Sequence, residues 1–389
     1  MKDSFQIIAK TFKGLEEVLA KELINLGGDE VQIERRAVSC KGDKEFLYKA
    51  NLHCRTASRL LIPIAHFEAK NADEVYDHVK KIDWEQYLDL KTSFSIDSTV
   101  FSDLFTHSKF VAYRVKDAIV DQFKEKYDKR PSVSITNPDL MINVHIAQTH
   151  CTISVDSSGE SLHKRGYRNS QTEAPINEAL AAGMLLLADW DGKSNFIDPM
   201  CGSGTFLIEA ALIALNIPPG IFRKSFGFEK WKDFDKELFD RLYNDDSHER
   251  DFDFKIYGSD ISSQAIKIAE QNIKSAGLSK YIQLQTVSIN DIEMPEGKCL
   301  MVTNPPYGER LQSEDLFGLY ENIGRMLKFK FAGNQAWVIS SDERCLFKIG
   351  LKPSKKIGLL NGDLDCLFCN YEVFAGKRDD YVRLKKEGE

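Results

Sequence analysis

The sequence predicts an α/β protein in which a Rossmann-like, mostly parallel sheet follows smaller α+β domains. After residue 178, apolar runs of strand length alternate with helix-periodic segments, which is typical of a doubly wound parallel sheet. Before residue 157, shorter strands and helices follow one another in mixed order, which is typical of α+β domains. The chain has 389 residues, enough for two or three domains that each bury a core.

Two small α+β domains are expected at the start of the chain, at residues 1–56 and 57–156. Gly27-Gly28 ends a helix within the first domain, and the turn Ser157-Ser158-Gly159 follows the last strand of the second. In the first domain we expect strands at 4–9 and 31–40 and helices at 15–26 and 44–52. In the second we expect strands at 58–67, 93–100, 132–136, 141–145 and 150–156, and helices at 71–82 and 108–127.

A linker at residues 157–170 leads to a third domain at residues 171–389. Residues 216–253 interrupt its strand–helix alternation with Phe, Trp, Lys and Asp, and we interpret them as an insertion carrying one or two helices. The expected strands are 195–198, 255–258, 282–287, 299–303, 335–340 and a hairpin of 356–360 with 365–374. The expected helices are 178–188, 205–215, 262–276 and 314–327.

Composition is that of a soluble globular protein, with 42% hydrophobic and 29% charged residues. No apolar stretch reaches the length of a membrane span, and the first residues lack the layout of a signal peptide. Eight cysteines without framework spacing indicate reduced thiols and a cytoplasmic location. The net charge of −7 argues weakly against a nucleic-acid partner, although it does not describe local patches.

A glycine-rich turn follows the short apolar strand that ends at Asp198. Glycines allow a ligand to approach the backbone closely, and the helix that follows offers N–H groups and a positive dipole end. A phosphate-binding P-loop is excluded because no Gly-Lys-Ser/Thr follows, and the third glycine of a dinucleotide fingerprint is absent. The candidate ligand-binding residues of this turn are Asp198, Pro199, Cys201, Gly202, Gly204 and Thr205.

Acidic and amide side chains also follow the next two strands of the predicted sheet. Asp260, with Ile261 beside it, ends one strand, where a carboxylate can accept both ribose hydroxyls of a nucleoside. The alternative is that Asp260 caps the next helix. Asn290 and Asp291 follow the third strand and could reach an adenine edge, or they could form an ordinary turn.

The sharpest motif is Asn304-Pro305-Pro306-Tyr307, about a hundred residues after the glycine-rich turn and directly after the apolar run 299–303. Two prolines fix the backbone and remove two N–H donors, so the Asn304 oxygen and a backbone carbonyl can converge on an exocyclic NH₂ group. Tyr307 is expected to stack on the base plane. Together the two motifs predict a site that brings a methyl donor to a planar amine, without a metal or a covalent nucleophile.

Two other features have simpler interpretations. Cys366 and Cys369 are spaced like metal ligands, but no second pair completes the set, and in a strand they face opposite sides, so we expect no metal site. Lys164, Arg165 and Arg168 form a basic cluster with an aromatic residue in the linker. This cluster is either solvated or, as we expect, in contact with nucleic acid.

Across nearly its full length the chain resembles the bacterial RNA methyltransferases that contain a THUMP domain, closest to the enzyme half that methylates the 2-amino group of a guanine in 23S rRNA. The matching stretches are 161–168, 174–178, 198–205, 304–311 and 361–366, with Pro218-Pro219-Gly220 in the insertion. This resemblance implies S-adenosylmethionine as the donor, with Asp198, Gly202 and Gly204 at its amino-acid end, Asp260 at its ribose and Asp291 near its adenine.

The resemblance also implies a ferredoxin-like domain at 1–56, a THUMP RNA-binding domain at 57–156 and a methyltransferase domain at 171–389. Asn304, Pro305, Pro306 and Tyr307 would then hold the target base. No membrane and no obligate protein partner are inferred. Because the motif does not distinguish amines, a tRNA guanine or DNA adenine methyltransferase stays an alternative, as does a noncatalytic RNA-binding assembly factor.

Overall fold

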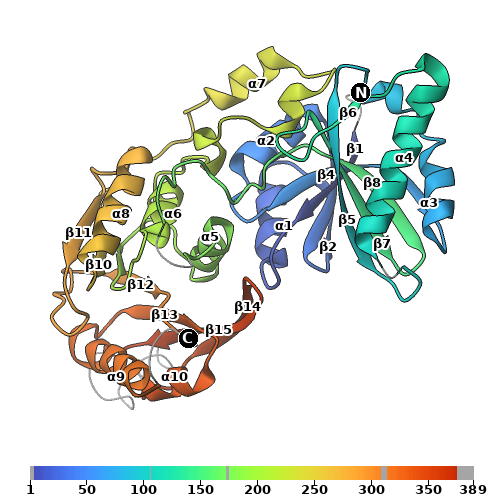
Figure 1. The fold of residues 1–389 in the computed structure, drawn as a ribbon. Helices are drawn as coiled ribbons and strands as arrows, with labels where there is room; N and C mark the ends of the chain where they lie inside the picture. The colour runs from blue at the N-terminus through green and yellow to red at the C-terminus, as the bar shows by residue number, and fades with distance from the viewer. Residues whose placement is uncertain (1–3, 106, 172–174, 308–312, 375–389) are drawn as a thin grey trace. The chain divides into compact units, whose positions relative to one another are not determined.

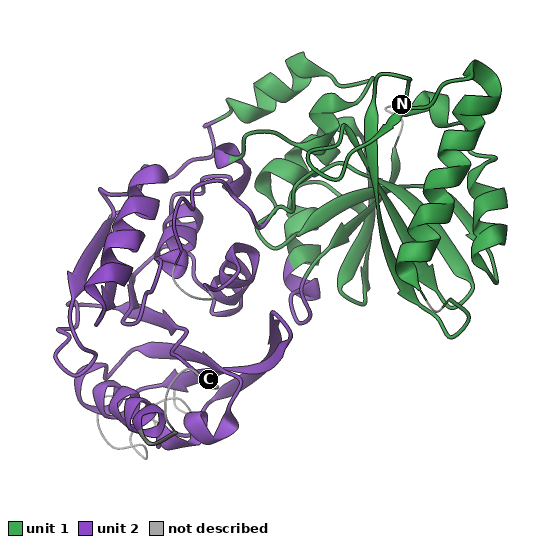
Figure 2. Ribbon diagram, viewed as in Figure 1, with its two compact units in different colours: residues 1–11, 19–162, 223–245 green, residues 12–18, 163–222, 246–389 purple. Residues whose placement is uncertain are grey.

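The computed structural model describes residues 4–105, 107–171, 175–307 and 313–374. The chain folds into two compact units (Figure 2). The first contains residues up to Thr11, Leu19–Leu162 and Arg223–Asp245, and the second contains Phe12–Val18, His163–Phe222 and the chain from Asp246 onward. The boundary between the units falls inside the predicted linker, because residues up to Leu162 belong to the first unit and residues from His163 to the second. The short segment Phe12–Val18 also belongs to the second unit.

The first unit is built on one eight-stranded sheet, in the order β2-β3-β1-β4-β8-β7-β5-β6 (Figure 1). Both predicted N-terminal domains contribute strands to it, because β4 pairs with β1 on one side and with β8 on the other. The strands are β1 Phe5–Lys10, β2 Asp29–Glu34, β3 Ala37–Gly42, β4 Arg59–Glu68, β5 Ser93–Phe101, β6 Ser132–Val133, β7 Leu140–Ala147 and β8 His150–Asp156.

The single strand predicted at residues 31–40 is two strands, and that prediction is wrong. β2 and β3 pair antiparallel, and the chain reverses at Arg35-Arg36, where Arg36 has a φ of +57°. Left-handed backbone is normally supplied by glycine or asparagine, so two arginines gave no turn signal.

Helices cover the first unit at α1 Glu16–Asn25, α2 Lys44–His53, α3 Ala72–Val79 and α4 Ser108–Tyr127. α3 and α4 bury Val75, Val79, Val115 and Ile119 in one cluster with Val144 and Ile153 of the sheet. Asp43 and Asn71 cap α2 and α3 by accepting from backbone N–H groups, which explains where these helices begin.

Most of the insertion packs in the first unit, not with the sheet that it interrupts. It contains the 3₁₀ turns η2 Pro219–Phe222 and η3 Gly227–Lys230 and helix α7 Lys236–Tyr243. The Phe228 ring stacks on Tyr48 of α2 with ring centroids 4.3 Å apart, and Phe239 meets both rings edge-on. We therefore correct the prediction that assigned the insertion to the C-terminal domain, because its aromatic residues complete a core elsewhere.

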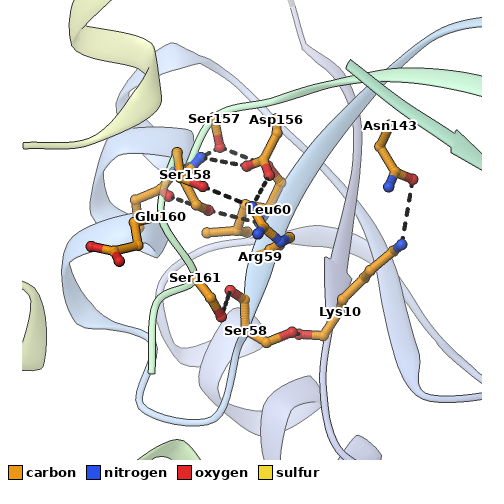
Figure 3. Close-up of polar contacts among 12 residues, drawn as sticks. Lys10, Ser58, Arg59, Leu60, Asn143, Asp156, Ser157, Ser158, Glu160 and Ser161 are labelled. Atoms are coloured by element: carbon orange, nitrogen blue, oxygen red, sulfur yellow. Dashed lines mark hydrogen bonds and ion pairs between the residues drawn. The ribbon is translucent and has the colours of Figure 1, made fainter. Parts of the chain in front are cut away.

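The end of β8 is held by polar contacts around Asp156 (Figure 3). Asp156 is buried, pairs with Arg59 and accepts from Ser158 N at 2.8 Å. Arg59 also donates to the Gly159 carbonyl at 2.7 Å, and Ser161 donates to the Ser58 carbonyl at 3.1 Å. These bonds fix the course of the first linker residues, directly after β8.

The second unit contains a seven-stranded sheet in the order β11-β10-β9-β12-β13-β15-β14, parallel except for β15. The mixed, mostly parallel sheet and the late hairpin were both predicted. Its strands are β9 Asn195–Asp198, β10 Ile256–Asp260, β11 Ile282–Thr286, β12 Cys299–Thr303, β13 Gln335–Ser340, β14 Lys355–Asn361 and β15 Leu364–Glu372. Its helices are α5 Glu178–Leu187, α6 Thr205–Ala214, α8 Ser263–Ser275, α9 Ser313–Lys330 and α10 Glu343–Lys348, of which α10 was not predicted.

Two hydrophobic clusters cover the two faces of this sheet. α5, α6 and α8 pack on the face that presents Phe196, Val302 and Phe368, whereas α9 and α10 pack on the face of Ile197 and Met301 (Figure 1). Cys366 belongs to the first cluster and Cys369 to the second, so the two thiols face opposite sides, as predicted. Among the described residues, no group of side chains could hold a metal ion, and no helix is long and apolar enough to cross a membrane.

Candidate active site

Three strand ends bring the predicted site residues to one edge of the second sheet. β9 lies between β10 and β12, with Asp198 opposite Gly258 and Ile197 opposite Met301. The carboxyl ends of parallel neighbours meet at the same edge, where open α/β sheets bind ligands. A cavity of about 690 Å³ lies there. Its walls include the predicted residues Asp198, Pro199, Cys201, Gly202, Thr205, Asp260, Ile261, Asn290, Asn304 and Pro306.

Four predicted site residues do not line this cavity: Gly204, Asp291, Pro305 and Tyr307. Several others that line it were missed. They include Pro175 and Ile176 before α5, Ser288 and Ile289 after β11, and Asp315, Gly318, Leu319 and Asn322 of α9. The α9 residues carry no recognisable motif, so only their approach to the cavity in the fold reveals them.

The glycine-rich turn needs its glycines for backbone conformation. Gly202 has a φ of +53° and Gly204 a φ of +81°, both in the left-handed region. A Cβ on Gly204 would also lie 3.2 Å from the Ala269 Cβ of α8, which is closer than ordinary packing. Gly204 therefore supports the turn on the side of α8 and not on the side of the cavity. Helix α6 starts directly after it at Thr205.

Asp260 fastens this turn to the end of β10. One carboxylate oxygen accepts from Gly202 N at 3.0 Å, and the other accepts from Ser262 N at 2.9 Å. The cap of α8 is Ser262, whose side chain accepts from Ala265 N, so the alternative role of Asp260 as the helix cap is wrong. Each oxygen of Asp260 keeps further acceptor capacity on the cavity wall, because a carboxylate oxygen has two lone pairs.

Asp198 is a buried carboxyl at the floor of the cavity, with 2% of its surface exposed. One of its oxygens accepts from Thr303 Oγ1 at 2.8 Å and from Met200 N at 3.2 Å. Burial raises the pKa of Asp198 to about 7; the two hydrogen bonds act in the opposite direction, and the Asp260 carboxylate adds to the rise. Asp198 can therefore change its charge near neutral pH, and a cation beside it would favour the ionised form.

Asn304 lines the same cavity and carries an unused hydrogen-bond acceptor. Its Oδ1 is buried and has no hydrogen-bond partner within the described parts of the chain. Leaving a buried acceptor unpaired costs about 1–3 kcal/mol, so such an atom marks a place where a ligand donor fits. An exocyclic amine is a ligand of that kind.

Tyr307 lies away from the cavity in this structure. Its side chain is 4% exposed and belongs to the same hydrophobic cluster as Leu359 and Phe368. Asn361 at the end of β14 donates to its hydroxyl at 2.6 Å. The predicted stacking on a base stays a prediction, and it requires the ring to leave this position. The rest of the motif, residues 308–311, lies outside the described residues.

The loop after β11 contributes Asn290 to the cavity, but not Asp291. Lys330 of α9 donates to the Asn290 and Ile292 carbonyls at 2.8 and 3.1 Å, which fixes the loop from outside. Asp291 N donates to the Ser288 carbonyl in a turn. For Asp291 the structure therefore matches the alternative, an ordinary turn.

Two of the three linker cations, Arg165 and Arg168, have little exposed surface and pair with carboxylates of the second unit, so their predicted contact with nucleic acid is wrong. Arg165 is 2% exposed and its Nε lies 3.5 Å from Glu209 Oε1, which also accepts from the Tyr167 hydroxyl at 2.9 Å. Arg168 pairs with Glu178 at 3.0 Å. Only Lys164 of the three is exposed. Burial of a charge requires a partner, and these arginines have theirs inside the unit.

Comparison with known families agrees with this geometry. A profile of the RMKL-like methyltransferase domain matches residues 165–370, more than half of the chain. The chain belongs to this family. Profiles of the THUMP domain and of the RlmL ferredoxin-like domain match residues 69–156 and 6–61. The predicted family and fold class are thus confirmed.

Relatives of this methyltransferase family member cover most of its length. A Synechocystis protein provisionally named RNA methyltransferase slr0064 is 40% identical, over 94% of this chain and 96% of its own. The ribosomal RNA large subunit methyltransferase K/L of Syntrophotalea carbinolica is 38% identical over 93% of this chain. The chain spans about half the length of that protein and of similar K/L relatives.

A solved structure has the same architecture. SMU.472, provisionally described as a methyltransferase and solved in complex with SAH, is 33% identical and has a TM-score of 0.86. The match covers 97% of this chain and 100% of the other.

Proposed function

We propose that this protein transfers the methyl group of S-adenosylmethionine to the exocyclic 2-amino group of a guanine in 23S rRNA. The observation that supports the proposal is the buried, unpaired Oδ1 of Asn304, a residue that lines the cavity together with the glycine-rich turn and Asp260. The carboxylates and the glycine-rich turn would bind a nucleoside, and the Asn304 oxygen would accept a hydrogen bond from an amine. The two components of a methyl transfer would thus meet in one cavity.

The donor supplies an activated methyl carbon on a sulfonium, and the protein's residues position the reactants around it. Asp260 would accept the ribose hydroxyls while it holds the turn through Gly202. Asp198, ionised beside a cationic ligand, would stabilise the donor's ammonium or sulfonium charge.

Asn304 Oδ1 would accept one N–H of the target amine and keep its lone pair directed at the methyl carbon. Such positioning lowers the barrier because the reacting atoms no longer have to find one another. A strong base is not needed, because the product ammonium loses its proton readily to water.

RNA binding by the first unit would fit a stripe of aromatic and basic side chains on α4, which we call the α4 stripe: Lys109, Phe110, Tyr113 and Lys116. Phe110, Tyr113 and Lys116 follow one another at intervals of three, and Lys109 lies four positions before Tyr113, so the four side chains fall on one side of the helix. Phe110 and Tyr113 are 54% and 60% exposed, and Lys116 Nζ lies 5.9 Å from the Tyr113 ring centroid. Exposed rings between cations suit unpaired bases and their phosphates, so the acidic net charge does not oppose an RNA substrate.

The decisive experiment is mass spectrometry of 23S rRNA from a deletion strain complemented with wild-type protein or with Asn304→Ala. The wild type should restore one N2-methylguanine, whereas Asn304→Ala should lower methylation by on the order of 10²-fold, as when a group that stabilises a transition state is removed. Transfer of labelled methyl groups to purified rRNA, tRNA and DNA separates the enzyme classes.

Three results would contradict the proposed function. Label in tRNA or DNA alone would favour the related methyltransferases. Unchanged methylation in the deletion strain would remove the rRNA substrate. A normal phenotype with Asn304→Ala, together with a deletion phenotype, would favour a noncatalytic assembly factor.

A further inference from the structure

Arg168 connects the linker to the first residue of helix α6. Its Nη2 donates to Thr205 Oγ1 at 2.9 Å and to the Ile176 carbonyl at 3.0 Å, and its Nε pairs with Glu178 at 3.0 Å. Thr205 and Ile176 both line the cavity, whereas Arg168 does not. Arg168 therefore lies behind the cavity wall and contacts two of the residues that form it.

The direction of the Arg168–Thr205 hydrogen bond constrains the Thr205 hydroxyl proton. A guanidinium has donors only, so Thr205 Oγ1 must be the acceptor in this pair. Its own hydrogen must point away from Arg168. Its neighbour within the turn is Ser203 Oγ, at a long 3.4 Å. A cavity ligand with a negatively charged oxygen would be a stronger acceptor for this proton.

The position of Thr205 at the start of α6 adds to this preference. The first N–H groups of a helix point along its axis with a positive partial charge, which attracts anions. The Glu178 carboxylate pairs with the Arg168 Nε and so holds the guanidinium in place. A hydroxyl donor and a helix N-terminus thus act on the same part of the cavity.

We propose that Arg168 is a positioning residue, which turns the Thr205 hydroxyl proton into the cavity to form a subsite for the carboxylate of the donor's amino-acid end. This inference rests on the proposed function, because the donor comes from it. Arg168 acts only through Thr205 and touches no reacting atom. This role would also account for the ion pair between Arg168 and Glu178, because a buried ion pair need not stabilise the fold by itself.

Calorimetry with two donor fragments tests this inference without methyl transfer. S-adenosylhomocysteine has the carboxylate, and 5′-methylthioadenosine lacks the whole amino-acid end. Arg168→Gln should weaken binding of the first by about tenfold, as expected when a hydrogen bond to a charged group is removed, and of the second by less than about twofold. Thr205→Val should have the same effect, and Thr205→Ser, which keeps a hydroxyl, should restore most of the affinity.

The double variant Arg168→Gln/Thr205→Val decides whether one residue acts through the other. If it does, the double variant should bind S-adenosylhomocysteine no more weakly than Thr205→Val alone. The matched control is Arg223→Gln in the first unit. Arg223 is also a buried arginine, and it donates to the Ser158, Glu160 and Ser161 carbonyls. It should lower the melting temperature but leave the ratio of the two dissociation constants unchanged.

The possible failures have different meanings. Equal weakening of both fragments by Arg168→Gln, or additive effects in the double variant, would overturn the carboxylate subsite while leaving the donor site intact. Wild-type protein that binds neither fragment would instead overturn the proposed function and this inference with it.

Discussion

The side-chain amide of Asn361 donates a 2.6 Å hydrogen bond to the hydroxyl of Tyr307. These residues are 54 positions apart, and the bond joins the loop after β12 to the turn of the β14–β15 hairpin. The aromatic residue of the motif is therefore held by Asn361, which belongs to residues 361–366, another stretch that carries the family resemblance. Release of the ring toward a base would break this bond and remove Tyr307 from its hydrophobic cluster.

Tyr307→Phe tests what the hydroxyl contributes. We expect the free energy of unfolding to fall by about 0.5–1.5 kcal/mol, the usual value of one hydrogen bond, with methylation retained because a phenyl ring stacks as well. Tyr307→Ala is the contrast and should cost about 3–5 kcal/mol, since it empties a buried site. Chemical denaturation and labelled-methyl transfer measure both. If Tyr307→Phe abolished transfer without loss of stability, the hydroxyl itself would take part in the reaction.

Local signals predicted those elements whose caps or periodicity lie within a few residues. α4 at Ser108–Tyr127, β8 at His150–Asp156 and β12 at Cys299–Thr303 match the predicted bounds. The glycine-rich turn and Asn304 were also recognisable, because few local structures use those residues in that order. What could not be predicted depends on distant partners: Tyr307 is buried through interactions with the β14–β15 hairpin.

The linker arginines were misinterpreted for a related reason, although the sequence held a usable signal. Glu178 and Glu209 are the sole charged residues of two otherwise apolar helices, with the sequences EALAAGMLLL and TFLIEAALIA. A carboxylate in such a helix is buried and needs a cation nearby. The basic linker provides one for each, so its cations indicated buried pairs more than an RNA surface.

Asp198→Asn should change the pH dependence of both stability and donor binding, in different directions. Burial raises the pKa of Asp198 to about 7 in the folded protein, above its ordinary value of 3.8. The folded state therefore binds a proton that the unfolded state releases, so the contribution of Asp198 to stability is greatest below its ordinary pKa and is lost as pH rises toward 7. Asparagine stays neutral, so the variant should raise the melting temperature at pH 8.5 more than at pH 5.5.

Asp198→Asn should weaken donor binding at high pH, although it stabilises the folded protein there. Affinity of the wild type for cationic S-adenosylmethionine should increase as pH rises through about 7, because Asp198 becomes ionised. Asp198→Asn should remove this rise. Calorimetry at several pH values measures it. An equally steep rise in the variant would show that another group controls the pH dependence.

Asn272 is expected to support the glycine-rich turn from α8. It is 1% exposed; its Nδ2 donates to the Ser203 and Ser170 carbonyls, and its Oδ1 accepts from Asn169 N and Ser170 N. Asn272→Ala would leave these backbone groups unpaired, at about 1–3 kcal/mol for each one that stays buried. We expect a lower melting temperature and faster amide hydrogen exchange at residues 169 and 170.

Asn216→Ala is the control for Asn272→Ala. Asn216 also donates its amide to a carbonyl, that of His248 at 2.8 Å, but this bond is exposed. Asn216→Ala should leave exchange at residues 169 and 170 unchanged. Normal exchange there in Asn272→Ala would mean that the turn and the linker do not depend on this side chain.

The α4 stripe makes the RNA-binding part of the proposal testable without chemistry. Phe110→Ala/Tyr113→Ala should weaken binding of a single-stranded rRNA fragment by about tenfold or more, because base stacking contributes roughly 1–3 kcal/mol per base. Its salt dependence should not change, since no cation is removed. Lys109→Ala/Lys116→Ala should instead weaken binding and reduce the slope of log K against log salt by about one for each phosphate that is no longer neutralised.

Phe347→Ala is the matched control, because that ring is 84% exposed on α10 and lies outside the α4 stripe. It should leave RNA affinity unchanged, and all of these variants should bind S-adenosylhomocysteine as the wild type does. Fluorescence anisotropy at several salt concentrations gives both the affinity and the slope. If both double variants instead bound RNA with the affinity and the salt slope of the wild type, the rings and cations of α4 would not contact RNA.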